Sequence, residues 1–149
     1  MDSDQYFKNR TSRPISKDLA FAESEFRRRI EEVRKVMDKE DLDALLITYP
    51  PNLSYLSGYQ SFGSGWYTCM ILPREGEPIL HMHQLEVGPA ILTCWVPDIR
   101  GVRWAQEGEA DALVGIVKER KLEGKRIGIE PKRPGLTLGL YEGLKHGLP

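Results

Sequence analysis

The chain has 149 residues, and its 21 lysines and arginines nearly balance its 22 aspartates and glutamates, which gives a formal net charge of −1. This balance excludes the strongly basic surface that nucleic acids and other polyanions attract, so we expect no nucleic-acid partner. No apolar run approaches the ~20 residues of a membrane span, so we expect no membrane partner, and the length suits one domain with a substantial core.

The N-terminal residues and the cysteines indicate the compartment. Residues 1–14 are polar and lack the apolar segment of a secretory signal. Cys69 and Cys94 both lie in apolar, strand-like contexts. A disulfide between them is one alternative, but we predict two buried free thiols in a cytoplasmic protein.

Residues 1–23 show no sustained hydrophobic period, and we interpret them as an N-terminal arm before a domain that spans residues 24–149. The first helix should follow, with Ser24 as its N-cap. Its apolar residues recur with the four-three-four spacing of a buried helix face; they are Phe26, Ile30, Val33 and Met37. The charged residues on the other side mix both signs and indicate a solvated face.

The stretch from Leu42 to Pro73 is unusual in composition. Its 32 residues contain one charged side chain, Asp43, and six of the thirteen aromatic residues. We predict a buried strand over 44–48, stopped by two prolines because proline cannot donate a ladder hydrogen bond. Asn52 is expected as a helix N-cap or turn former, before a short helical turn over 53–56 that closes at Gly58. A second strand is expected over 66–72.

The remaining elements alternate between strands and helices. Residues 74–77 predict a tight turn, so strands 66–72 and 78–83 should form an antiparallel hairpin. The other expected elements are a helix over 85–92 interrupted at Gly88 and Pro89, a strand beginning at Trp95, a helix from Ala110 to near Gly124, a strand over 125–130, and a helix over 138–145 with Thr137 as its N-cap. This alternation predicts an α/β, three-layer domain with a mixed β-sheet of five or six strands flanked by helices.

His81 and His83 are the strongest metal-ligand candidates in the chain. Their spacing places both imidazoles on one face of a strand, and Glu86 follows closely, so a hydrolytic zinc site is one alternative. No other residues complete a ligand set, and we favour the interpretation that both histidines form local hydrogen bonds at a strand end. The serines and cysteines have no nucleophile motif around them, and we predict no catalytic residue and no cofactor in this chain.

The loop from Tyr59 to Tyr67 remains as a candidate surface. It is rich in glycine and aromatic residues and contains no charge, a composition typical of interfaces and pocket walls. We predict that Gln60, Phe62, Trp66 and Tyr67 lie near a substrate or at an interface. The alternative is that Trp66 and Tyr67 alternate in and out of the sheet, which would bury one of them.

The pattern LDALLITYPPNLSYLSGY resembles the start of the N-terminal domain of the creatinase/prolidase family, the pita-bread metallohydrolases and their relatives. The distinctive element is N-x-x-Y-L-S-G, formed here by residues that include Asn52, Tyr55, Leu56 and Gly58. The resemblance extends from about Glu25 to Pro149. It implies that a further strand, a linker and a C-terminal catalytic domain, all absent from this chain, follow in a longer protein.

The resemblance also implies a function. The longer protein would hydrolyse C–N bonds, as an Xaa-Pro dipeptidase or aminopeptidase or as a creatinase-like enzyme acting on a small amidine or amide. Its catalytic domain would carry the ligands for two divalent metal ions in those members that use metal. The N-terminal domain would be non-catalytic, would support a homodimer, and would wall the active site of the neighbouring subunit, with Gln60, Phe62 and Trp66 nearest the substrate.

Two other hypotheses belong to different classes. The chain is either a free-standing α/β module that binds a small molecule or a protein, or a zinc hydrolase that uses His81 and His83. The first of these differs from the family interpretation in whether the natural protein continues past Pro149. A further domain with the family's metal ligands would favour the longer hydrolase over the free-standing module. A metal assay would test the second.

Overall fold

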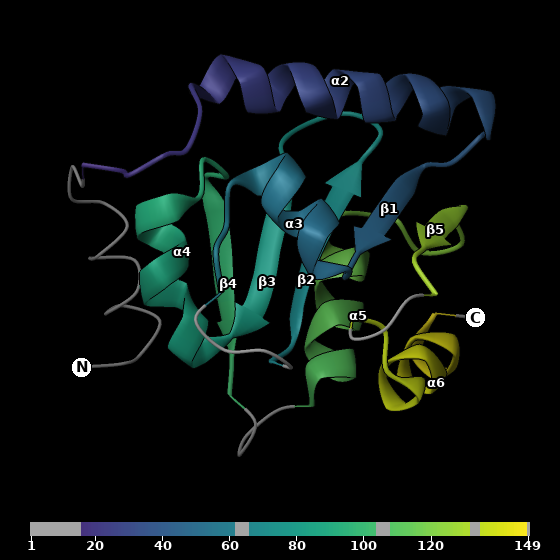
Figure 1. Cartoon of the computed structure of the whole chain (residues 1–149). Coiled ribbons are helices and arrows are strands. Elements are labelled where there is room, and N and C mark those ends of the chain that lie inside the picture. The colour runs from purple at the N-terminus through teal and green to yellow at the C-terminus, as the bar shows by residue number, and fades with distance from the viewer. Residues whose placement is uncertain (1–15, 62–65, 104–107, 132–134, 149) are drawn as a thin grey trace.

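A five-stranded mixed sheet forms the middle layer of the computed structural model, which describes residues 16–61, 66–103, 108–131 and 135–148. The strand order is β4-β3-β2-β1-β5, with β1 at Ala44–Ile47, β2 at Thr68–Pro73, β3 at Ile79–His83, β4 at Asp98–Val102 and β5 at Ile127–Ile129. The middle strand β2 pairs antiparallel with β1 and with β3, whereas the edge strands β5 and β4 pair in parallel with β1 and β3. Figure 1 shows the arrangement.

The described helices cover both faces of the sheet. They are α2 (Glu23–Lys39), α3 (Pro50–Ser57), α4 (Val87–Thr93), α5 (Glu109–Glu119) and α6 (Leu138–Gly147), with a short 3₁₀ helix, η1, at Gln84–Glu86. Side chains from α2, α3 and α4 pack with Ile47, Met70 and Leu80 on one face. Side chains from α5 and α6 pack with Leu46 and Ile71 on the other. The three-layer α/β fold with a mixed sheet is therefore confirmed (Figure 1).

The two faces follow from the alternation of side chains along each strand. Neighbouring positions such as Leu46 and Ile47 enter opposite cores, as expected from a strand period of two. The cysteines divide in the same way: Cys69 lies in the core under α5, and Cys94 lies in the core under α2. Both are buried free thiols, as predicted, and burial raises the pKa of each above its usual value.

Several predicted boundaries are wrong. Helix α2 begins at Glu23 after an N-cap at Ala22 that makes no side-chain cap, so Ser24 lies inside the first turn. The strand expected at Trp95 begins at Asp98, because Trp95 instead buries its ring in the core and donates its Nε1–H to the carbonyl of Leu56 at 2.8 Å. Strand β2 begins at Thr68, so Trp66 precedes it.

The helix ends show how local chemistry sets the boundaries. Helix α5 stops at Glu119 rather than near Gly124, and Lys121 takes a left-handed φ of 57° just beyond it. Pro89 does not interrupt α4, because it sits in the first turn, where no intrahelical partner for its missing N–H is needed. Thr137 caps α6 as predicted, accepting the Leu140 N–H at 3.1 Å.

The described part of the expected N-terminal arm lies against α4. The backbone N–H of Asp18 donates to the carbonyl of Leu92 at 2.8 Å, and Lys17 Nζ donates to the carbonyl of Cys94 at 2.6 Å. Among the described helices, none is long and apolar enough to cross a membrane.

Candidate functional site

The turn from β1 into α3 carries the N-x-x-Y-L-S-G element. Tyr49 is the N-cap residue of α3, and Pro50 and Pro51 occupy the first helical positions. The prediction that Asn52 caps this helix is wrong, because Asn52 lies inside the first turn. A side-chain cap would also have few N–H groups to accept here, because the first two helical residues are prolines and have none.

Glu130 holds the two residues that lead into α3. Its carboxylate accepts the backbone N–H of Thr48 at 2.8 Å and that of Tyr49 at 2.9 Å. The side-chain amide of Asn52 donates to the other oxygen of the same carboxylate. Asn52 therefore ties the start of α3 to the end of β5, a contact between residues far apart in the sequence.

Gly58 ends α3 in a left-handed conformation, as predicted. Its φ is +77°, and its N–H donates to the carbonyl of Ser54 at 2.9 Å. A Cβ at this position would meet the carbonyl oxygen of Thr93 and the ring of Phe26, each at 2.9 Å. Glycine is thus required by both backbone angle and space.

Two further residues of the element, Tyr55 and Leu56, have different surroundings. Leu56 is buried in the core. Tyr55 is half exposed, and its ring lies 4.4 Å from the guanidinium carbon of Arg29, which is itself nearly buried. Arg29 also donates to the Tyr55 carbonyl at 2.8 Å, so this arginine holds α3 against α2.

The candidate loop leaves α3 through a first stem, Tyr59–Ser61. Tyr59 is buried in the core, and its hydroxyl donates to Glu86 Oε2. The Ser61 hydroxyl donates to the same oxygen at 2.9 Å. Burial, reinforced by the bond to Glu86, raises the pKa of Tyr59 above its usual value, so the phenol stays protonated and acts as a donor.

The loop returns through a second stem, Trp66–Tyr67. The Trp66 ring meets the His83 ring edge to face, with centroids 4.6 Å apart. The Tyr67 hydroxyl shares a 2.8 Å hydrogen bond with His81 Nδ1, and these two rings also meet edge to face at 5.2 Å. Both stems are therefore held by residues of one segment, His81–Glu86.

The three suspected zinc ligands thus hold the loop instead of converging on a metal. His81 binds Tyr67, His83 contacts Trp66 while its Nδ1 accepts the Leu85 N–H at 3.3 Å, and Glu86 binds the first stem. Within the described ranges no three His, Cys, Asp or Glu side chains gather closely enough to hold a metal ion. Burial, with a smaller effect of Arg100, lowers the pKa of His81 to about 4.

The predicted site residues occupy different environments. Gln60 is exposed, with its N–H directed at Thr93 Oγ1 at 3.4 Å. Trp66 is 36% exposed, whereas Tyr67 is only 7% exposed. Phe62 lies outside the described residues. Leu85 is also exposed, and its backbone N–H donates to His83, the residue whose ring meets Trp66.

Sequence reasoning missed the partnership of Glu86 with Tyr59 and Ser61. These residues are 25 to 27 positions apart and meet only through the β2–β3 hairpin and the turn into α4. One signal was available: Glu86 is the single charged residue between His83 and Asp98. A lone carboxyl in so apolar a segment needs donors if it is buried.

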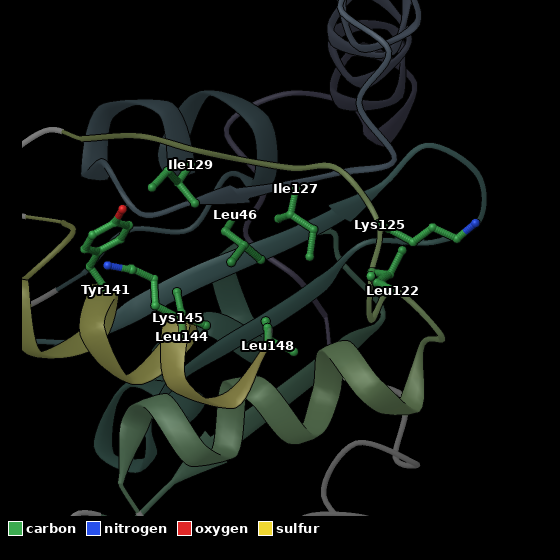
Figure 2. A pocket seen from close by; sticks show the side chains of 10 residues that line it. Leu46, Leu122, Lys125, Ile127, Ile129, Tyr141, Leu144, Lys145 and Leu148 are labelled. Atoms are coloured by element: carbon green, nitrogen blue, oxygen red, sulfur yellow. The ribbon is translucent and has the colours of Figure 1, made fainter.

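A groove lies at the opposite edge of the sheet, between the edge strand β5 and helix α6. This groove has a volume of about 350 Å³. Ile129, Leu46 and Leu144 give it an apolar wall, and Lys125 and Lys145 stand at its rim (Figure 2). Tyr141 borders the groove and is 37% exposed. None of the residues predicted for the site lines this groove.

Comparison with known proteins gives one family and a consistent fold. Residues 29–149 match the sequence profile described as the Creatinase/Prolidase N-terminal domain. A relative, the ectoine hydrolase of Halomonas elongata, is 33% identical over 85 residues, which cover 56% of this chain and 21% of the relative. The chain thus spans about a fifth of the curated relatives that it matches.

Two solved structures share the fold at low sequence identity. The N-terminal domain of an Xaa-Pro dipeptidase from Lactobacillus brevis has a TM-score of 0.71 and 18% identity, covering 81% of this chain and 88% of that one. A proline dipeptidase of Streptococcus pneumoniae has a TM-score of 0.67 and 24% identity, covering 80% of this chain and 84% of that one.

Proposed function

Because the chain belongs to the family of creatinase/prolidase N-terminal domains, we propose that it is the non-catalytic domain of a longer hydrolase that cleaves C–N bonds. In this proposal it supports a homodimer and walls the active site of the neighbouring subunit through the loop between Tyr59 and Tyr67. The substrate is either an Xaa-Pro peptide or a small amide or amidine. The dipeptidase names of the structural relatives and the hydrolase name of the curated relative support both classes.

The observation that carries the proposal is that the polar residues near the loop contact its two stems. His81, His83 and Glu86 are the candidate metal ligands from the sequence, and each is engaged in holding a loop stem. Near these residues the exposed described side chains are uncharged, and they include Trp66, Leu85 and Gln60. An uncharged aromatic surface on an anchored frame suits contact with a partner better than chemistry of its own.

His81 and His83, the metal-ligand candidates among the described residues, are poorly placed for a hydrolytic zinc ion. His81 Nδ1 is occupied by the Tyr67 hydroxyl, and His83 Nδ1 accepts a backbone N–H. A hydrolytic zinc needs three convergent protein ligands and an open position, and these donors are turned to other partners. We therefore assign two divalent metal ions, where the longer protein uses them, to its C-terminal catalytic domain. We also propose a cytoplasmic location, which the two buried free thiols support.

The test uses the longer protein, assayed on an Xaa-Pro dipeptide and on ectoine. Trp66→Ala and Phe62→Ala should reduce kcat/KM while the urea unfolding transition stays near that of the unchanged protein. Lys35→Ala is the control, because Lys35 lies on the exposed face of α2, away from the loop. Normal kcat/KM in both loop variants would refute the proposed role of the loop.

The groove beside α6 favours a second candidate function, a free-standing binding module. Its apolar wall and the lysines at its rim would suit a ligand with an apolar body and a negative charge. Fluorescence titration of the chain with anilinonaphthalene sulfonate, an apolar anion, tests this candidate. Saturable binding that is lost in Ile129→Glu would support it, and the absence of saturable binding would remove it.

A further inference from the structure

One oxygen of Glu86 receives both hydroxyl groups of the first stem. Tyr59 and Ser61 each donate to Oε2, the latter at 2.9 Å, and Glu86 is only 4% exposed. A carboxyl group so deeply buried is costly unless donors surround it. The two hydroxyl groups supply the hydrogen bonds that the buried carboxyl needs, and the carboxyl is their common acceptor.

The frame that carries Glu86 is fixed by its neighbours. Glu86 ends η1 and immediately precedes α4, and both elements pack on the edge strand β4. Farther along α4, Thr93 Oγ1 faces the backbone N–H of Gln60 at 3.4 Å and itself donates to the Pro89 carbonyl at 3.0 Å. The first stem is thus attached to the start and to the end of the same helix.

We infer that Glu86 is a positioning residue: its carboxyl oxygen sets the place of the first stem, Tyr59–Ser61. The functional meaning rests on the proposed function, in which the loop walls a neighbouring active site. Glu86 itself touches no substrate. Its role is to hold Tyr59 and Ser61 in place. Gln60, the exposed residue between them, is thereby held in a fixed position.

Two substitutions distinguish whether Glu86 acts as a hydrogen-bond acceptor or only fills space. Glu86→Gln keeps a carbonyl oxygen that can accept both hydroxyls, whereas Glu86→Met has similar length and no comparable acceptor. Tyr59→Phe and Ser61→Ala remove the two donors one at a time. Tyr141→Phe is the matched control, because it removes a tyrosine hydroxyl from the groove at the other end of the sheet.

The measurement is amide hydrogen exchange of the 149-residue chain at Tyr59 and Gln60, with urea unfolding of every variant. Glu86→Met should speed exchange at these amides about tenfold or more, and each donor variant should speed it less. Glu86→Gln should restore protection, and Tyr141→Phe should not change it. If Glu86→Met proves unfolded, Tyr59→Phe and Ser61→Ala decide the question, because each keeps the acceptor in place.

Unchanged exchange in Glu86→Met, or in both donor variants, would overturn the inference. Equal loss of protection in Glu86→Gln and Glu86→Met would do the same. Exchange in this chain needs no enzymatic activity, so the result stands apart from the proposed function. Faster exchange in Glu86→Met combined with normal kcat/KM of that variant in the longer protein would contradict the proposed function and leave the positioning of the stem intact.

Discussion

The hydroxyl of Tyr67 lies 2.8 Å from Nδ1 of His81, and this contact joins the second stem of the loop to the middle of strand β3. Both side chains are nearly inaccessible, at 7% and 2% exposure. Burial raises the pKa of the phenol and lowers the pKa of the imidazole, so the pair is neutral over the physiological range.

Tyr67→Phe should destabilise the chain by ~1 kcal/mol, because it removes the hydroxyl and leaves a buried ring nitrogen without that partner. Urea unfolding followed by circular dichroism measures the change. Tyr141→Phe serves again as the matched control and should lie within ~0.5 kcal/mol of the unchanged chain. Equal stabilities for Tyr67→Phe and Tyr141→Phe would show that the bond contributes nothing.

His81 should make stability fall in mild acid. Its pKa is about 4 in the folded chain against about 6.5 when exposed, so the unfolded chain binds the proton first as the pH drops. The contribution is therefore complete above pH ~6.5, declines between ~6.5 and ~4, and amounts to about 3 kcal/mol at most. Urea midpoints measured across this range should fall less steeply for His81→Leu. Parallel curves for the two proteins would contradict the shifted pKa.

Gly58→Ala should cost more than ~1 kcal/mol, because alanine at a φ of +77° is strained and its Cβ would press on the Thr93 carbonyl. Gly139→Ala is a useful comparison, since nothing lies within 4 Å of a Cβ there and the residue is in helix α6. Gly139→Ala should be neutral or stabilising. A Gly58→Ala variant as stable as Gly139→Ala would mean that α3 ends differently.

Asn52 and Glu130 should be energetically coupled. Asn52→Ala is expected to lower stability by ~1 kcal/mol, through loss of its bond to Glu130 and not through loss of a helix cap. A double-mutant cycle with Glu130→Ala should therefore give a coupling energy of ~0.5 kcal/mol or more. Strictly additive effects would contradict the contact between the two side chains.

The sequence was sufficient for the architecture because the architecture depends on periodic patterns. The apolar runs at residues 44–48 and 66–72, the turn at residues 74–77 and the helical stripe of α2 indicate which segments are buried. Gly58 and Thr137 were also predictable, because the chemistry of a helix end is local. These signals need no knowledge of distant residues.

The errors arose where a distant residue decides the local role. Asn52 looks like a cap until Glu130 is placed beside it by the parallel pairing of β1 with β5. Trp95 has strand propensity, yet a hydrogen bond to Leu56 and burial in the core hold it before β4. In the candidate site, His81, His83 and Glu86 have the spacing of metal ligands, and only the tertiary contacts show that each holds a loop stem.

The central claim, that the loop serves the neighbouring subunit, is tested most directly by mixed dimers of the longer protein. One inactive variant carries Trp66→Ala, and the other lacks a metal ligand or equivalent catalytic residue in the C-terminal domain. If the loop acts across the dimer, co-refolding at equal amounts should restore roughly a quarter of the normal activity, because half of the dimers are mixed and each has one complete site. Activity no higher than that of the separate variants would show that the loop serves its own subunit or none, and would contradict the account.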